Sequence, residues 1–68
     1  MKQYQNLYNA INQAAQVQAR DVFCLPENKV AHFIDCFTRN RYSTACRLIK
    51  AGVRTEEELI ATYSGERS

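Results

Sequence analysis

The sequence predicts an all-α protein: a small compact bundle of about four short helices, the last two forming a helix-turn-helix-like hairpin. Apolar residues recur at the three- and four-residue spacing of helical faces along the chain. No segment alternates polar and apolar residues as a half-buried strand does, and neither Asn-Gly nor Asp-Gly, which are typical of β-hairpin turns, occurs. Because 68 residues leave room for one domain, we expect a single helical domain over residues 1–68.

The first helix is expected from Tyr4 to Arg20. Neither Gly nor Pro interrupts this run, and its apolar face consists of Tyr4, Leu7, Tyr8, Ile11, Ala14 and Ala15. Small domains commonly gain stability by oligomerising. We therefore expect that this helix could form a homodimer, with a self-association surface made of Leu7, Ile11 and Ala14.

Two further helices are expected on either side of Asn40. Pro26 suits the first turn of a helix, where its missing N–H has no partner, so the second helix is predicted from about Pro26 to Thr38. Its apolar stripe consists of Val30, Phe33, Ile34 and Phe37. Asn40 is interpreted as a break or as the cap of a third helix over roughly residues 41–51, whose inward face is Tyr42, Ala45, Cys46, Leu48 and Ile49.

Capping signals surround the connection to the last helix. Gly52 stands where a left-handed C-terminal cap is expected. Thr55 and Glu58 have the spacing of a capping box, and the glutamates at 56–58 suit the positive end of the helix dipole. The fourth helix is expected to begin at Thr55 and to fray over residues 64–68, and its buried face consists of Leu59, Ile60 and Tyr63.

This connection resembles a known motif. Residues 45–59 read ACRLIKAGVRTEEEL and fit the pattern A-x-x-L-x-x-A-G-[IV]-x-T-x-x-[ED]-L. The pattern is similar to the helix–turn–helix joint of the C-terminal domain of the bacterial RNA polymerase alpha subunit and of helix-hairpin-helix domains. The resemblance implies that Gly52 caps one helix, Val53 plugs the core and Thr55 starts the next helix. In the helix-hairpin-helix family a glycine-containing hairpin contacts DNA phosphates, usually as one of a pair, and no second hairpin is evident in this sequence.

Composition is that of a soluble globular protein, with 46 % hydrophobic and 24 % charged residues. Uninterrupted apolar runs are only a few residues long, so no transmembrane helix and no membrane partner are expected. The cysteines, Cys24, Cys36 and Cys46, are odd in number, whereas small secreted domains usually carry pairs. The start of the chain lacks the apolar core of a signal peptide. We therefore expect a cytoplasmic protein with reduced thiols.

The spacing of His32 and Cys36 is the one that suggests a metal site or a catalytic pair. Four residues apart on a helix, they could face one metal ion or form a nucleophile–base pair. Cys24 and Cys46 lie on other elements, and no two cysteines have the close spacing of a zinc knuckle. No phosphate-binding loop or serine-nucleophile motif is evident. We predict no enzymatic activity, no metal and no cofactor.

The net charge of +2 conceals an uneven distribution. The first nineteen residues carry one charged side chain, Lys2, and eight amides, whereas five basic and no acidic residues lie between Cys36 and Thr55. Tyrosine and arginine are prominent in the hot spots of protein interfaces. We place a partner-binding surface on the basic stretch, made of Arg39, Arg41, Tyr42, Arg47, Lys50 and Arg54.

The leading hypothesis is a small non-enzymatic regulatory or inhibitory protein that binds another protein through this tyrosine and arginine surface. Small accessory proteins of phages and plasmids are typical of the class. So short a chain has little interior for a ligand cavity of about 300–1,000 Å³. The alternative is a nucleic-acid-binding regulator that uses the basic stretch 39–54. Five phosphate contacts would give its binding a log–log salt slope of about −4 to −5.

Overall fold

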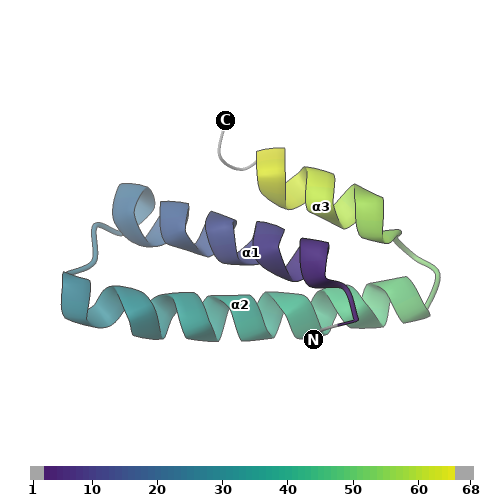
Figure 1. Ribbon diagram of the computed structural model, residues 1–68, viewed down its shortest axis with the longest axis horizontal. Coiled ribbons are helices and arrows are strands. Elements are labelled where there is room, and N and C mark those ends of the chain that lie inside the picture. The colour runs from purple at the N-terminus through teal and green to yellow at the C-terminus, as the bar shows by residue number, and fades with distance from the viewer. Residues whose placement is uncertain (1–2, 66–68) are drawn as a thin grey trace.

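The computed structural model describes residues 3–65, and this part of the chain consists of three helices and no strands. The first helix, α1 (Gln5–Val17), continues into a π-helical segment, η1 (Gln18–Val22). It is followed by α2 (Glu27–Lys50) and α3 (Glu56–Gly65). Figure 1 shows α2 running back along α1, while α3 turns back again on the opposite side of α1. Few contacts join α2 and α3, so α1 is the central helix of the molecule.

The predicted break at Asn40 is wrong, because α2 continues without interruption from Glu27 to Lys50. Neither Gly nor Pro lies in this run. Asn40 is exposed in the middle of the helix, where asparagine costs only about 0.5 kcal/mol relative to a strong helix former. That cost is too small to end a helix held by tertiary packing, and residues 3–65 form three helices instead of the expected four.

The connection between α1 and α2 begins with a π-helical segment and ends in a turn at Cys24. The predicted first helix extends to Val22, with its last residues in the π-helical form. Cys24 then adopts φ +50°, a left-handed conformation, and the Leu25 N–H donates to the Ala19 carbonyl at 2.9 Å. Pro26 is extended, with ψ 153°, and α2 begins at the next residue. Pro26 is thus the N-cap of α2, and the helix begins one residue after the start predicted at Pro26.

The connection between α2 and α3 has the predicted caps. Gly52 has φ +76°, its N–H donates to the Ile49 carbonyl at 3.1 Å, and the Val53 N–H donates to the Leu48 carbonyl at 3.0 Å. This pair of hydrogen bonds is a Schellman motif. The Glu58 N–H donates to the Thr55 hydroxyl at 3.2 Å, and the Thr55 N–H donates to the Glu58 carboxylate at 3.4 Å, which completes the capping box.

Val53 departs from the expectation that the resemblance raised. Its side chain is 62 % exposed, so it does not plug the core. The reason is the position of α3, which packs on α1 and hardly touches α2. The turn residues are therefore left at the edge of the molecule.

The core forms around α1 and is narrow. Its main cluster is Leu7, Ile11, Ala45 and Leu59, drawn from all three helices. Leu7, Ile11 and Ala14, which we predicted to form a self-association surface, are instead buried within one chain, with exposures of 0 %, 0 % and 1 %. Leu7 and Ile11 pack there with Ala45 of α2 and Leu59 of α3.

Small residues line the contact between α1 and α2. Ala14, Ala15 and Ala19 are buried on α1, and Thr38 and Ala45 are buried on α2. The Asn12 side-chain amide donates to the Thr38 hydroxyl at 3.5 Å, which gives this buried polar group a partner. Small side chains allow the two helices to approach closely along this part of their contact.

The last helix agrees with the prediction for its buried face. Leu59 is buried, and Ile60 and Tyr63 are half-buried against the core. Residues 64 and 65 belong to α3, so the expected fraying does not include them. Residues 66–68, for which fraying was also expected, lie outside the described residues. Over residues 3–65, no helix has the length and apolar character needed to span a membrane.

Candidate functional site

The six residues predicted to bind a partner do not share one surface. Arg39, Arg41, Arg47, Lys50 and Arg54 are exposed, but Tyr42 is half-buried. Tyr42 follows Thr38 and precedes Ala45 and Ile49 at spacings of four, three and four, which places it on the side of α2 that faces α1. The tyrosine therefore belongs to the contact between helices and not to the basic surface.

The surroundings of Tyr42 explain its role in the fold. Its hydroxyl accepts a hydrogen bond from the Tyr4 backbone N–H at 3.2 Å, and its ring meets that of Tyr8 edge-on, with centroids 5.4 Å apart. Burial raises the pKa of the Tyr42 hydroxyl above its ordinary value, and this effect exceeds the lowering by the Tyr4 N–H. Tyr42 joins the start of α1 to α2.

The basic residues differ in how they are held. The Arg39 guanidinium lies 3.2 Å from the Asp35 carboxylate, and that of Arg54 lies 3.8 Å from Glu58. These four side chains are all more than half exposed, so the pairs contribute little to stability. The Arg41 guanidinium instead lies over the Phe37 ring, 5.2 Å from its centroid. Arg41 is thereby oriented by an aromatic side chain, as in a cation–π interaction.

None of the three phenylalanines of the chain is fully buried, although Phe37 packs against the core. Phe23, in the turn before α2, is 54 % exposed, and its ring centroid is 5.3 Å from that of Phe33. The Phe33 ring stacks on Phe37 at 5.7 Å, and Arg41 covers Phe37 in turn. We call these four residues, Phe23, Phe33, Phe37 and Arg41, the phenylalanine face. It is an aromatic surface that ends in a cation.

Two shallow hollows lie along this face and share Phe33 and Cys36. Two rows of α2 side chains line them, each row at a four-residue spacing; the first is Lys29, Phe33, Phe37 and Arg41, and the second is Asn28, His32, Cys36, Asn40 and Thr44. Leu25 closes the end near the turn. Rows at this spacing form the ridges of a helix, and the groove between two ridges receives the side chains of a packed helix.

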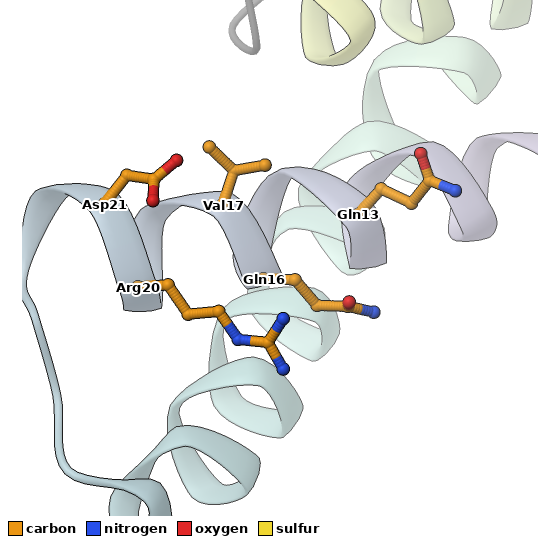
Figure 2. Close-up of a pocket in the computed structure, with 5 residues that line it drawn as sticks. All are labelled: Gln13, Gln16, Val17, Arg20 and Asp21. Atoms are coloured by element: carbon orange, nitrogen blue, oxygen red, sulfur yellow. The ribbon is translucent and has the colours of Figure 1, made fainter.

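A separate hollow at the end of α1 lacks aromatic side chains and an excess of positive charge. Figure 2 shows Gln16 and Arg20 projecting from one side of the helix, while Val17 and Asp21 project from another. With Gln13, these residues supply one positive charge, one negative charge and one apolar side chain. The π-helical form of the segment is often found at functional sites, but no side chain here is both buried and polar. We do not place the site at this hollow.

His32 and Cys36 lie close together, as their spacing indicates. The Cys36 Sγ is 3.6 Å from the His32 Nε2, and both residues are exposed. Cys24 and Cys46 are free thiols that do not join them. Within residues 3–65, no three His, Cys, Asp or Glu side chains are grouped so that they could hold a metal ion.

The phenylalanine face was not predicted from the sequence, although its spacing is visible there. Lys29, Phe33, Phe37 and Arg41 follow one another at intervals of four, which on one helix forms a continuous ridge. The presumed break at Asn40 separated Arg41 from the other three. With the break removed, the spacing alone identifies the row.

Comparison of the chain with protein-family models, curated proteins and solved structures gave no match.

Proposed function

We propose that this chain is a small non-enzymatic regulatory or inhibitory protein that acts by binding another protein, and that the phenylalanine face is its binding surface. The observation that supports this proposal is the position of the phenylalanines. None of the three is fully buried: Phe23 is more than half exposed, Phe33 is half-buried, and Phe37 is half-buried against the core, whose fully buried members are smaller side chains. A contiguous exposed apolar surface is typical of an interaction site.

The composition of the face also favours a protein partner. Aromatic residues and arginine are enriched in protein interfaces, whereas lysine and the acidic residues are depleted at their centres. Phe33, Phe37 and Arg41 already contact one another in the free chain. Their side chains therefore lose less conformational freedom on binding than separate, mobile side chains would.

Affinity capture with variants of the face tests the proposal. The wild-type chain and its Phe23→Ala variant are immobilised and exposed to an extract of the native host, and the retained protein and nucleic acid are both identified. Phe23 is 54 % exposed, so its replacement should leave the helical circular-dichroism signal intact. We expect one set of proteins to be retained by the wild type and lost from the Phe23→Ala column.

Val53→Ala is the matched control. Val53 is also an exposed apolar residue, at 62 %, but it lies in the turn beyond the other end of α2. This variant should retain the same proteins as the wild type. Retention that is equal on the wild-type, Phe23→Ala and Val53→Ala columns would contradict the placement of the surface.

A nucleic-acid-binding regulator is the second candidate, and one observation favours it. Arg47 and Lys50 are exposed on α2, three residues apart, and no described carboxylate lies within ion-pair distance of either. With Arg39, eleven residues before Lys50, they share the outward side of the helix. Three phosphate contacts would give a log–log salt slope of about −2 to −3, which is shallower than five contacts would give.

A gel shift separates the two candidates. Binding to duplex or single-stranded nucleic acid at low salt that Arg47→Glu and Lys50→Glu abolish, and that Phe23→Ala leaves unchanged, would support the second candidate. The absence of any shift would remove it.

A further inference from the structure

We propose that the occupant of the phenylalanine face is an amphipathic helix of an acidic partner protein, carrying two apolar side chains between two carboxylates. This inference rests on the proposed function and names the kind of partner. It follows from three features of the groove along α2: the arrangement of its side chains in rows, its position on a helix and its charge.

The rows define the shape of the occupant. Lys29, Phe33, Phe37 and Arg41 form one ridge of α2, and the row from Asn28 to Thr44 forms the next. A second helix packs best when its own ridge of residues four apart enters the groove between two such ridges. The distance from Lys29 to Arg41 is twelve helical residues, or about 18 Å, so between about three and four turns of a partner helix match the groove.

Because the face lies on a helix, it also restricts the secondary structure of the partner segment. The backbone hydrogen-bonding groups within α2 are used inside the helix itself, so the face offers no free edge to which an extended strand could add. Recognition must depend on side chains that enter the groove. An amphipathic helix with apolar residues at three- and four-residue intervals is the form of partner that uses such a groove.

The positive charge along the groove favours a partner helix with negative charge. Lys29 and Arg41 stand at the two ends of the phenylalanine row, and His32 lies in the neighbouring row. No carboxylate lines either hollow. A partner helix that carries a glutamate or aspartate near each end of its apolar pair would complement this pattern, whereas lysines at the same positions would be repelled.

The acidic cluster of a second copy does not meet the requirement. Glu56, Glu57 and Glu58 open α3, but the apolar residue that follows them, Leu59, is buried in its own core. Acidic and apolar side chains of α3 are therefore not presented together, and we assign the occupant to another protein.

Synthetic peptides test the proposal with the intact chain. The probe is a labelled helix-forming peptide of about 16 residues with the row Glu, Leu, Leu, Glu at four-residue spacing. A second peptide has lysine in place of both glutamates, and a third has the residues of the first in scrambled order. Binding is measured by fluorescence anisotropy at low and at high salt.

We expect the acidic peptide alone to bind, with an affinity that falls as salt is added. Phe33→Ala and Phe23→Ala should each weaken binding by about tenfold or more, because truncation of an aromatic anchor has the largest effect at an interface. The double variant Lys29→Glu/Arg41→Glu should weaken it by about tenfold and make the lysine peptide bind instead. Arg47→Glu reverses a charge on the same helix outside the two rows and should leave binding unchanged.

Four results would overturn the proposal. The first is equal binding of the acidic and lysine peptides, and the second is binding that neither Phe23→Ala nor Phe33→Ala weakens. The third is binding to phosphatidylserine vesicles in place of the acidic peptide, which would assign the face to a membrane. The fourth is a dimer, measured by sedimentation, that Phe33→Ala dissociates, which would assign it to a second copy.

The failure of this inference differs from the failure of the proposed function. If affinity capture depends on Phe23 but the acidic peptide does not compete with the captured protein, the face binds protein of another form. If capture does not depend on Phe23, the proposed function itself is wrong.

Discussion

The two sides of α2 differ in the size of the side chains that they carry at their centres. On the side toward α1, the fully buried residues are Thr38 and Ala45, both small. On the outward side, Phe33, Phe37 and Arg41 form a contact series that remains partly exposed. The comparison shows that the fully buried residues of α2 are small, whereas the phenylalanines of this region keep part of their surface exposed.

The largest expected difference between the two sides is in stability. Ile11 is fully buried against the inward side of α2, in a cluster with Ala45. Ile11→Ala should lower the free energy of unfolding by about 2–5 kcal/mol, because it removes buried methyl groups and leaves a cavity. Small domains have only about 5–15 kcal/mol of stability in total, so urea denaturation followed by circular dichroism should show a large loss.

Phe23→Ala is the control for the outward side. It removes a larger side chain, but one that is more than half exposed, and we expect a loss of under about 1 kcal/mol, the scale for a single modest interaction. If Phe23→Ala costs as much as Ile11→Ala, the outward aromatics belong to the core and the distinction between the two sides fails.

A smaller effect with a specific pH dependence is expected at Tyr42, on the edge of the inward side. At neutral pH, Tyr42→Phe should cost about 0.5–1.5 kcal/mol, the net contribution of its hydrogen bond with Tyr4. Since burial raises the pKa of the folded state above that of the unfolded chain, the wild type loses stability as the pH rises beyond about 10. The variant lacks this titration.

The difference in stability between the wild type and Tyr42→Phe should therefore narrow in alkaline solution. Denaturation at neutral pH and at several values above pH 10 would measure it. A difference that stays constant over this range would show that the hydroxyl is not desolvated by the contact between α1 and α2.

The smallest effect on stability is expected at Asn40, on the outward side. Whether its replacement raises or lowers the stability distinguishes a residue inside a helix from a helix cap. Because Asn40 lies inside a continuous helix, Asn40→Ala should stabilise the chain by about 0.5 kcal/mol through its better helix propensity. If Asn40 instead capped a separate helix, the same substitution would destabilise the chain by about 1 kcal/mol. Thermal denaturation of the two proteins distinguishes a gain from a loss.

Local signals in the sequence predicted the ends of the helices well. Gly52 marks the end of α2, and the capping box of Thr55 and Glu58 marks the start of α3, because each depends on residues within a few positions of one another. The start of α2, at Glu27, lies one residue after the start predicted at Pro26, for the same reason. The all-helical class was also predictable from apolar periodicity.

Features that depend on contacts between helices could not be predicted in this way. Thr38 is polar in sequence but buried in the structure, because Asn12 of another helix supplies its partner. Leu7 and Ile11 were correctly assigned to an apolar face, yet their neighbours lie in α2 and α3 and not in a second copy. The periodicity of α2 showed that Phe33 and Phe37 share a stripe, but which stripe faces α1 is decided by the fit of the two helix surfaces.

The central position of α1 has a consequence for how the chain folds as it is made. Helix α1 is synthesised first, but the helices that cover it on either side, α2 and α3, come later in the chain. A nascent chain that has reached only Lys50 can pair α1 with α2, and it still exposes the surface on α1 that Leu59 will cover. Since domains fold as units, cooperative folding must wait until α3 has left the ribosome, and the first helix made is the last to be fully enclosed.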